Sequence, residues 1–372
     1  MVDDTRAALG RLAHHWREKF AIPLVALTGS NGKTTVKEML AAILAAHAGG
    51  REHVLATQGN LNNDIGMPLT LLGLRPGHRF AVIEMGMNHE GEIDYLTRIA
   101  EPTVALVNNA QRAHVGILGS IEAIARAKGE IYSGLGPAGT AIVNEDDAFA
   151  GYWRDLNRTR RVISFGFAPE AEVRGAVTPE GWRIATPAGA FAFSPRVRGE
   201  HNLRNAMAAS AAAYALGIPA ATMREGLAVF GGVAGRLQRR SGPAGSVVID
   251  DSYNANPESM RAALRVLAEE RGRKVFVMGD MGELGAEAPA MHAEVGAYAR
   301  EAGVDALLAI GDASREAVNA FGHGARHFAD IDTLTQAARG EAAAGAAILV
   351  KGSRFMRMER VADALAPEAG RA

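Results

Sequence analysis

Residues 24–36, with the sequence LVALTGSNGKTTV, constrain the fold of this 372-residue chain more than any other stretch. A short apolar run leads into a loop with two glycines, one lysine and two threonines, and apolar residues at helical spacing follow. This order predicts a buried strand, a phosphate-binding loop and the N-terminus of a helix. The arrangement is typical of a nucleoside triphosphate site in an α/β protein.

The chemistry of the loop matches ATP and magnesium. Its glycines let backbone N–H groups turn towards phosphate oxygens, Lys33 can neutralise phosphate charge, and Thr34 can place a hydroxyl on Mg²⁺. Leu27 stands where the full eight-position phosphate-loop pattern has glycine, so the loop is a shortened relative of that pattern. An ordinary glycine-rich turn is the alternative, and the flanking strand and helix favour phosphate binding. The expected ATP contacts are Gly29, Asn31, Gly32, Lys33, Thr34 and Thr35.

Composition narrows the possible partners and the location. With 40 basic and 41 acidic residues the net charge is -1, so no global field attracts nucleic acid, and we predict no nucleic-acid partner. The absence of cysteine excludes disulfides and thiolate metal sites. No apolar run is long enough to span a membrane, and residues 1–20 do not resemble a signal peptide. We therefore predict a cytoplasmic protein without membrane insertion.

The first half of the chain has the rhythm of a mostly parallel sheet covered by helices. Its apolar runs lie at 24–27, 80–85, 103–107 and 141–143. Short β-like pieces between 161 and 199, with turn signals at 178–181 and 186–189, predict antiparallel hairpins next to that sheet. An alanine-rich helix is predicted at 201–216.

A second βα series follows a glycine-rich joint at residues 231–245. Its predicted strands are 247–249, 275–278, 306–310 and 347–350. We therefore expect a mostly parallel central domain that contains the phosphate loop and, after it, a Rossmann-like domain. The predicted boundaries are an N-terminal helix and linker at 1–21, the ATP-binding domain at 22–234 and the C-terminal domain at 235–372.

Two side chains that follow strands of the first series are candidate metal ligands. Glu84 places a carboxylate in an otherwise apolar strand, which is costly unless the carboxylate meets a cation. A strand-end acid that reaches water is the alternative. His114 follows the strand at 103–107, but a lone histidine in a loop is more often a surface residue than a ligand.

Lys128 lies on an apolar helical stripe with Ile121, Ile124 and Ile131. A lysine that points inward must pair, lose its proton or be modified. A neutral amine can react with CO₂ to give a carbamate, which would turn the lysine into an anionic metal ligand. The alternative is a lysine whose ammonium group reaches solvent past the end of the helix.

Three further groups are candidates for nucleotide contacts. Asn202 and Asn205 lie one helical turn apart and can read an adenine edge, although helix capping by Asn202 explains the pattern equally well. Asp250 and Asp251 follow a predicted strand and can accept hydrogen bonds from ribose hydroxyls, or can form an Asx-rich turn only. Arg236 in the joint can swing onto a phosphate.

With these residues in place, the chain resembles the Mur ligases, the ATP-dependent amide-forming family of peptidoglycan synthesis. The resemblance covers essentially the whole chain and is nearest to the branch that joins D-alanyl-D-alanine to UDP-N-acetylmuramoyl-tripeptide. The motifs that carry it are TQGNLNNDIGMPL at 57–69, EMGMN at 84–88, DDSYNANP at 250–257, VMGDMGELG at 277–285 and KGSR at 351–354.

The resemblance implies roles for these residues and two Mg²⁺ sites. Lys33 and Thr34 would hold the triphosphate and, with Glu84, the first Mg²⁺, while His114 and a carbamylated Lys128 would hold the second. The remaining implied contacts are adenine for Asn202 and Asn205, phosphates for Arg236, ribose for Asp250 and Asp251, and the acidic substrate for Asn60. The implied catalytic residues are Lys33, Lys128, His114 and Arg236.

The resemblance also implies a first domain that binds the UDP-muramoyl portion, and here only a helix precedes Ile22. We expect that domain to be missing, or to come from a separate domain or chain. The other interpretations are a standalone ligase for a different carboxylate and amine, and an inactive nucleotide-binding partner. A mechanoenzyme or simple kinase explains neither the inward lysine nor the second α/β domain.

Overall fold

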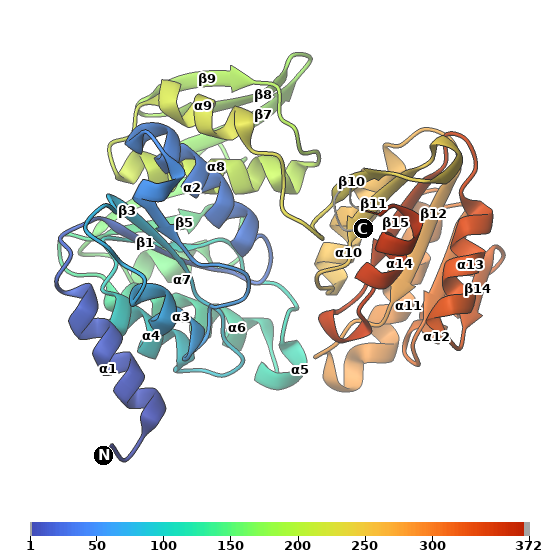
Figure 1. Ribbon diagram of the computed structural model, residues 1–372, viewed down its shortest axis with the longest axis horizontal. Coiled ribbons are helices and arrows are strands. Elements are labelled where there is room, and N and C mark those ends of the chain that lie inside the picture. The colour runs from blue at the N-terminus through green and yellow to red at the C-terminus, as the bar shows by residue number, and fades with distance from the viewer. Residues whose placement is uncertain (1, 368–372) are drawn as a thin grey trace. The chain divides into compact units, whose positions relative to one another are not determined.

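Two α/β units form the computed structural model, which describes residues 2–367 (Figure 1). The first unit comprises Met1–Gln111 and Leu118–Gly231, and the second comprises Arg112–Ile117 and Gly232–Ala372. The short segment Arg112–Ile117 therefore groups with the second unit, although the sequence on both sides of it groups with the first. The domain boundaries expected from the sequence stay a prediction.

A nine-stranded sheet forms the centre of the first unit, in the order β2-β3-β1-β4-β5-β6-β7-β8-β9. All neighbouring pairs from β2 to β7 are parallel, and β7, β8 and β9 form two antiparallel hairpins, as the turn signals predict. The strands are β1 (Leu24–Thr28), β2 (Val54–Ala56), β3 (Phe80–Glu84), β4 (Val104–Val107), β5 (Thr140–Asn144), β6 (Arg161–Gly166), β7 (Val173–Thr178), β8 (Gly181–Thr186) and β9 (Gly189–Phe193).

Several helices of the first unit bury an apolar face. In α2, for example, the stripe predicted from the sequence, Val36, Met39, Leu40, Ile43 and Leu44, is completely buried or nearly so. The helices of this unit are α1 (Thr5–Arg17), α2 (Lys33–Ala48), α3 (Gly66–Leu71), α4 (Glu92–Ala100), α6 (Ile121–Gly129), α7 (Ala150–Asp155), α8 (Glu200–Ala215) and α9 (Ala220–Val229), with the short 3₁₀ turns η1 (Arg51–His53) and η2 (Glu130–Gly134). The short helix α5 (Val115–Leu118) lies mostly in the segment that groups with the second unit.

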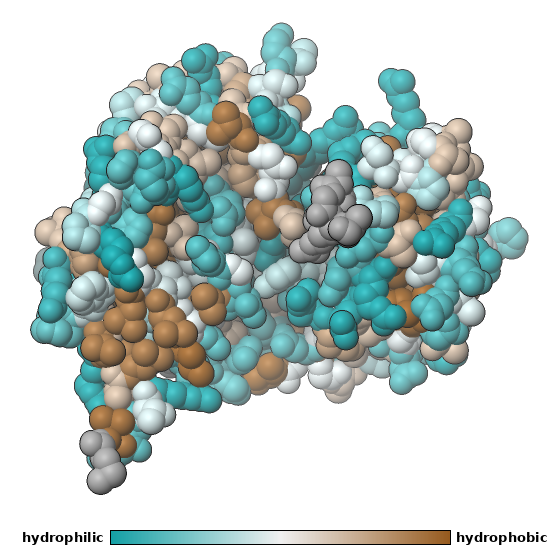
Figure 2. Space-filling view, in the orientation of Figure 1, coloured by the Kyte–Doolittle hydropathy of each residue, from teal (hydrophilic) through white to brown (hydrophobic). Residues whose placement is uncertain are grey.

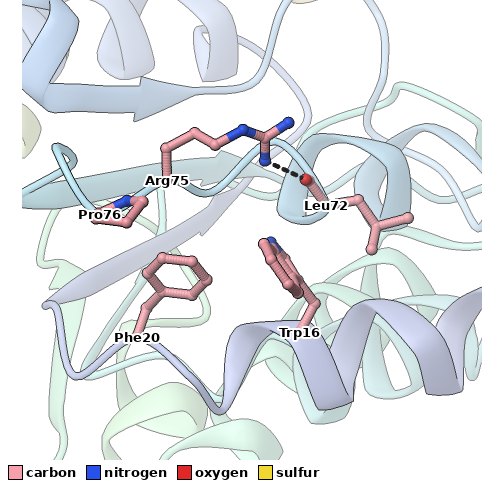
Figure 3. Close-up of a pocket in the computed structure, with 5 residues that line it drawn as sticks. All are labelled: Trp16, Phe20, Leu72, Arg75 and Pro76. Carbon is pink, nitrogen blue, oxygen red and sulfur yellow. Dashed lines mark hydrogen bonds between the residues drawn. The ribbon is translucent and has the colours of Figure 1, made fainter.

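The N-terminal helix α1 is attached to the first unit. The Trp16 indole N–H donates to the Leu74 carbonyl at 3.2 Å, and the Arg17 guanidinium donates to the Ala100 carbonyl at 3.1 Å. Between the C-terminal end of α1 and the residues that follow α3 is a shallow hollow of about 410 Å³ (Figure 3). Its lining residues are Trp16, Phe20, Leu72, Arg75 and Pro76.

Apolar side chains gather on the surface over α1 and α3 (Figure 2). The exposed large hydrophobic residues of α1, α3 and the loop before α3 are Leu12, Leu61, Ile65 and Leu69. Within residues 2–367, none of the helices combines the length and the apolar composition that crossing a membrane requires.

The second unit has a six-stranded sheet in the order β10-β11-β15-β12-β13-β14, parallel except for the edge strand β10. Its strands are β10 (Gln238–Ser241), β11 (Val247–Asp251), β12 (Lys274–Gly279), β13 (Ala306–Ile310), β14 (Ala325–Phe328) and β15 (Ala347–Lys351). Its helices are α10 (Pro257–Ala268), α11 (Ala288–Glu301), α12 (Ser314–Phe321), α13 (Ile331–Glu341) and α14 (Glu359–Leu365), with η3 (Pro243–Gly245), η4 (Gly285–Glu287) and η5 (Arg354–Met356).

Both faces of this second sheet are buried. Along β12, Phe276 and Met278 belong to the core on one face, whereas Val275 and Val277 belong to the core on the other. Alternate burial on two faces is the physical reason for the nearly continuous apolar runs of parallel strands. The predicted α/β class, with a mostly parallel first sheet and a second α/β unit, is therefore confirmed.

Candidate functional site

The predicted phosphate loop connects β1 to α2 at the carboxyl end of β1. Gly32 occupies the N-cap of α2 with φ 80°, and no side chain caps the helix there. A Cβ atom on Gly32 would lie 2.3 Å from Asn205 Oδ1 and 2.6 Å from Asn108 Nδ2. Glycine is thus required both by the left-handed backbone and by the lack of space. The result is an open helix N-terminus, which is suited to an anion.

Residues that follow β4, which were not among the predicted site residues, brace the loop. The Asn109 side chain accepts from Asn31 N at 2.9 Å, and Asn108 Nδ2 and Asn109 Nδ2 donate to the Asn31 carbonyl at 2.9 and 3.1 Å. Ser30 Oγ donates to the Gln111 carbonyl at 3.0 Å and accepts from Gln111 N at 2.9 Å. The loop is therefore held in shape before any nucleotide binds. The polar run NNAQ directly after an apolar strand was the available signal.

The lysine and threonines of the loop lie at the start of α2. The Lys33 ammonium donates to the Gly29 carbonyl at 2.7 Å, so its positive charge lies over the loop. Thr34 and Thr35 are largely buried at the first turn of the helix. This arrangement puts a cation and the helix N-terminus on the same small region, as phosphate binding requires.

Glu84 and Thr34 meet, as the predicted first metal site requires. Thr34 Oγ1 donates to Glu84 Oε2 at 2.8 Å, and Asn62 Nδ2 donates to Glu84 Oε1 at 2.8 Å. Glu84 is only 2% exposed, so the alternative of a strand-end acid in water is wrong. Asn62 was missed because its contact with Glu84 depends on how the loop after β2 folds back over β3.

The donor set fits Mg²⁺ rather than a metal held by protein alone. Within residues 2–367 there is no group of three or more His, Cys, Asp or Glu side chains that could hold a metal. Mg²⁺ commonly takes one or two carboxylates, keeps several waters and binds the phosphates of its nucleotide. One buried carboxylate beside a threonine hydroxyl at a phosphate loop is consistent with that pattern.

Lys128 on α6 is buried, with 2% exposure, so the alternative of a lysine that reaches solvent is wrong. Its apolar neighbours on the predicted stripe, Ile124 and Ile131, are fully buried. No hydrogen bond or ion pair of the ammonium group is found among residues 2–367. Burial, and to a smaller extent the nearby charge of Lys33, hold the pKa of Lys128 well below its ordinary value.

His114 lies in the segment that groups with the second unit. Its Nδ1 is 2.6 Å from Glu283 Oε2, and Gly116 N donates to the Glu283 carbonyl at 2.9 Å. In the same segment, Arg112 pairs with Glu258 at 2.5 Å and with Glu294 through two bonds of 2.8 Å. Because His114 and Lys128 belong to different units, their joint metal site stays a prediction.

The two asparagines of α8 lie together, as predicted. Asn205 Nδ2 donates to Asn202 Oδ1 at 3.3 Å, and Asn205 Oδ1 accepts from Asn108 Nδ2 at 3.1 Å. The capping interpretation of Asn202 is wrong, because Gly199 is the N-cap and the Asn202 side chain donates to the Arg198 carbonyl at 2.8 Å. The pair therefore lies next to the phosphate loop, and its contact with adenine stays a prediction.

The acids that follow β11 are already engaged. Asp250 accepts from Ser252 N at 3.0 Å, which is an Asx turn, and forms an ion pair with Arg240. Asp251 lies 2.6 Å from the Lys351 ammonium. Burial raises the pKa of the Asp251 carboxyl, and Lys351 opposes that shift. Neither cation partner, Arg240 or Lys351, follows from the local sequence pattern around the two acids.

The last two predicted residues lie in different surroundings. Arg236 stacks over the Tyr253 ring, with its guanidinium carbon 4.2 Å from the ring centre. Asn60 is exposed in the loop before α3, where its carbonyl accepts from Asn62 N at 2.8 Å. Neither the phosphate contact of Arg236 nor the substrate contact of Asn60 is tested by this geometry.

Comparisons with known proteins match most of the chain to one family. A family model described as the Mur ligase middle domain matches residues 27–213, and one described as the Mur ligase, glutamate ligase domain matches residues 235–354. The UDP-N-acetylmuramoyl-tripeptide--D-alanyl-D-alanine ligase of Escherichia coli K12 is 43% identical over 375 residues, which cover 98% of this chain and 81% of the relative. The Bacillus subtilis enzyme of the same name is 35% identical over 97% of this chain and 79% of the relative.

Solved structures give the same result. MurF from Acinetobacter baumannii superposes with a TM-score of 0.89 at 39% identity, over 97% of this chain and 80% of that one. The MurF ligase from Thermotoga maritima, solved in complex with ADP, has a TM-score of 0.84 at 25% identity, over 98% of this chain and 84% of that one. The chain thus spans about four fifths of the proteins that it matches.

Proposed function

The chain belongs to the Mur ligase family, and we propose that it is the ATP-dependent ligase that adds D-alanyl-D-alanine to UDP-N-acetylmuramoyl-tripeptide in peptidoglycan synthesis. The observation that carries the proposal is the meeting of Thr34 with the buried Glu84 beside the Lys33 ammonium at the end of β1. Groups of these types, in this order along the chain, bind a triphosphate and its Mg²⁺ in phosphate-loop proteins.

The proposed reaction has two steps, phosphoryl transfer and amide-bond formation. A carboxylate oxygen of the tripeptide attacks the γ-phosphorus of ATP, so that ADP leaves and an acyl phosphate forms. The dipeptide amine then attacks the acyl carbon, loses a proton and displaces inorganic phosphate. Lys33 and the N-terminus of α2 neutralise the phosphate charge during the first step. Thr34 and Glu84 would hold an Mg²⁺ ion, which would supply further neutralisation.

A second Mg²⁺ between His114 and a carbamylated Lys128 is part of the proposal. The neutral amine of Lys128 can add CO₂ and release a proton, which gives a carbamate with two oxygen donors. The burial of Lys128 and the absence of a partner within residues 2–367 support this modification, because a neutral amine is the reactive form. Catalytic roles for Lys128, His114 and Arg236 are proposed on the same basis.

The nucleotide contacts are proposed for residues of both units. Asn202 and Asn205 would read the adenine edge, and the position of Asn205 beside Gly32 supports this. Asp250 and Asp251 would accept from the ribose hydroxyls through oxygens not fully used by their ion pairs. Asn60 would contact the acidic substrate, and the C-terminal domain at 235–372 would receive the incoming amine.

The location and the partners follow from the substrates. Because ATP and a UDP-linked peptide are cytoplasmic metabolites, we place the reaction in the cytoplasm with small molecules as partners. A further domain or chain would bind the UDP-muramoyl portion. The alternatives are a standalone ligase for another carboxylate and amine, and a nucleotide-binding partner without catalysis.

Phosphate release tests these alternatives. The purified chain is given ATP, Mg²⁺, UDP-N-acetylmuramoyl-tripeptide and D-alanyl-D-alanine, and in parallel a panel of simpler acids and amines. We expect release with the peptide pair and a drop of roughly 10³-fold for Lys33→Ala, because a preorganised charge contact with the transition state is lost. The exposed Lys19→Ala serves as the control. ATP binding without turnover for every pair would instead support the inactive partner.

A further inference from the structure

Two arginines share one aromatic ring at the strand-end edge of the second unit. Strands β11 and β15 are parallel neighbours in the sheet. Tyr253 follows β11, and Arg354 follows β15. The guanidinium carbon of Arg236 lies 4.2 Å from the centre of the Tyr253 ring, and that of Arg354 lies 5.6 Å from it. Two cations held against one ring create a positive surface that is suited to anions.

The acids around this surface leave Arg354 largely uncompensated. Asp251 is paired with Lys351, and Asp250 with Arg240. Glu359 approaches the Arg354 guanidinium only at 3.5 Å, and the Arg354 side chain remains 66% exposed. Such a long, exposed pair contributes little, so the guanidinium keeps its capacity for a two-pronged bond to a carboxylate.

An exposed aromatic side chain follows this arginine in the sequence. Phe355 is 63% exposed, and its ring covers Gly282, where an added Cβ atom would lie 2.9 Å from Phe355 Cε1. The turn beneath is fixed, because Ser353 Oγ accepts from Gly282 N at 2.8 Å and donates to the Ala255 carbonyl at 3.2 Å. A guanidinium and an apolar ring therefore project from one rigid turn.

We propose that Arg354 binds the terminal carboxylate of the incoming D-alanyl-D-alanine, and that Phe355 packs against a methyl group of the dipeptide. This inference rests on the proposed function. The amine of the dipeptide must be neutral to attack the acyl phosphate, so the carboxylate is the remaining charged group by which the protein can recognise it. Arg354 thus sets specificity for a free carboxylate.

A paired comparison of substrates tests the role of Arg354. KM is measured for D-alanyl-D-alanine and for its C-terminal carboxamide, with the wild type and with Arg354→Gln. A charge-assisted bond corresponds to a 10- to 100-fold rise in KM for the dipeptide, whereas KM for the carboxamide and for ATP should change less than about twofold. Arg354→Lys should recover part of the loss, and the exposed Arg360→Gln on α14 should behave as the wild type does.

The outcomes separate this inference from the proposed function. A wild type that releases no phosphate with the dipeptide contradicts the proposed function. An active wild type with an Arg354→Gln variant that is unchanged, or equally impaired towards dipeptide and carboxamide, overturns the carboxylate contact.

A second comparison tests Phe355. We expect Phe355→Ala to raise KM for D-alanyl-D-alanine several-fold and to leave KM for glycylglycine, which has no methyl groups, nearly unchanged. An equal change for both dipeptides would overturn the methyl contact.

Discussion

The two sheets differ in whether the buried charged side chains at the carboxyl ends of their strands have ion-pair partners. In the first unit, Glu84 and Lys128 are both buried, and neither has an ion-pair partner among residues 2–367. In the second unit, the buried Asp250 and Asp251 each have a cationic partner, Arg240 and Lys351. Buried charges without an ion-pair partner are costly and mark places where a ligand can complete the structure. We infer that the buried charges at the strand-end edge of the first sheet depend on ligands for their compensation, whereas the ion pairs of Asp250 and Asp251 at the edge of the second sheet also stabilise the fold.

The largest expected effect is the loss of stability when the ion pair between Asp251 and Lys351 is broken. Lys351→Met leaves the Asp251 carboxylate buried without its partner, and we expect a loss of about 3–5 kcal/mol of stability in urea unfolding at pH 7. The matched control is the double variant Asp251→Asn/Lys351→Met, which should recover most of that loss. Equal destabilisation of single and double variants would show that the pair contributes through packing rather than charge.

The second prediction concerns Glu84, the buried carboxylate at the strand-end edge of the first sheet. Glu84→Gln keeps the size of the side chain but removes the charge, so we expect kcat to fall about 10²-fold and the Mg²⁺ concentration for half-maximal rate to rise. The rise in melting temperature on adding Mg-ATP should shrink as well. Glu90→Gln, an exposed acid after the same strand, is the control. An unchanged Mg²⁺ requirement would place the metal elsewhere.

The third prediction is a gain in stability on removing the buried amine of Lys128, in contrast to the loss expected for Lys351→Met. Lys128→Met removes a buried amine without a partner, so we expect a stability gain of about 1–3 kcal/mol at neutral pH together with loss of ligase activity. Because the folded state lowers the pKa of Lys128, the unfolded state binds more protons, and wild-type stability should rise with pH towards the ordinary value of 10.5. The variant should lose that rise. A lower melting temperature for Lys128→Met at pH 8 would reveal a stabilising partner.

The smallest effect concerns the segment Arg112–Ile117. Arg112→Gln removes partly exposed ion pairs to Glu258 and Glu294, and we expect a loss of about 1 kcal/mol. Hydrogen exchange over residues 112–117 should become faster. Arg261→Gln, which pairs with the same Glu294 at 3.1 Å from α10, is the matched control. Equal hydrogen-exchange rates over residues 112–117 in the two variants would mean that the ion pairs of Arg112 do not stabilise the position of this segment.

The parts of the fold that depend on local pattern were predictable from the sequence. Strands with continuous apolar runs, such as β1 and β13, and the inward stripe of Lys128 follow from periodicity alone. The short or polar strands β2, β10 and β14 were not predicted, because each is an edge strand with little apolar signal.

The missed site residues depend on strand order rather than on local pattern. Asn109 reaches the phosphate loop because β4 lies beside β1, and Asn62 reaches Glu84 because β2 lies beside β3. No local pattern states that order. Lys351 meets Asp251 across 100 residues of sequence for the same reason, since β15 lies beside β11. The residue types were visible in the sequence, but their partners were set by topology.

The grouping of Arg112–Ile117 with the second unit has a consequence for dissecting the protein. The chain passes between the units three times, after Gln111, after Ile117 and after Gly231, rather than once. A single cut near residue 231 therefore cannot yield two intact halves. The C-terminal fragment would lack the segment Arg112–Ile117, which carries His114. The N-terminal fragment would keep this segment without its partners Glu258, Glu283 and Glu294. Swapping halves between relatives at that point would give chimaeras in which this short insert comes from the wrong parent.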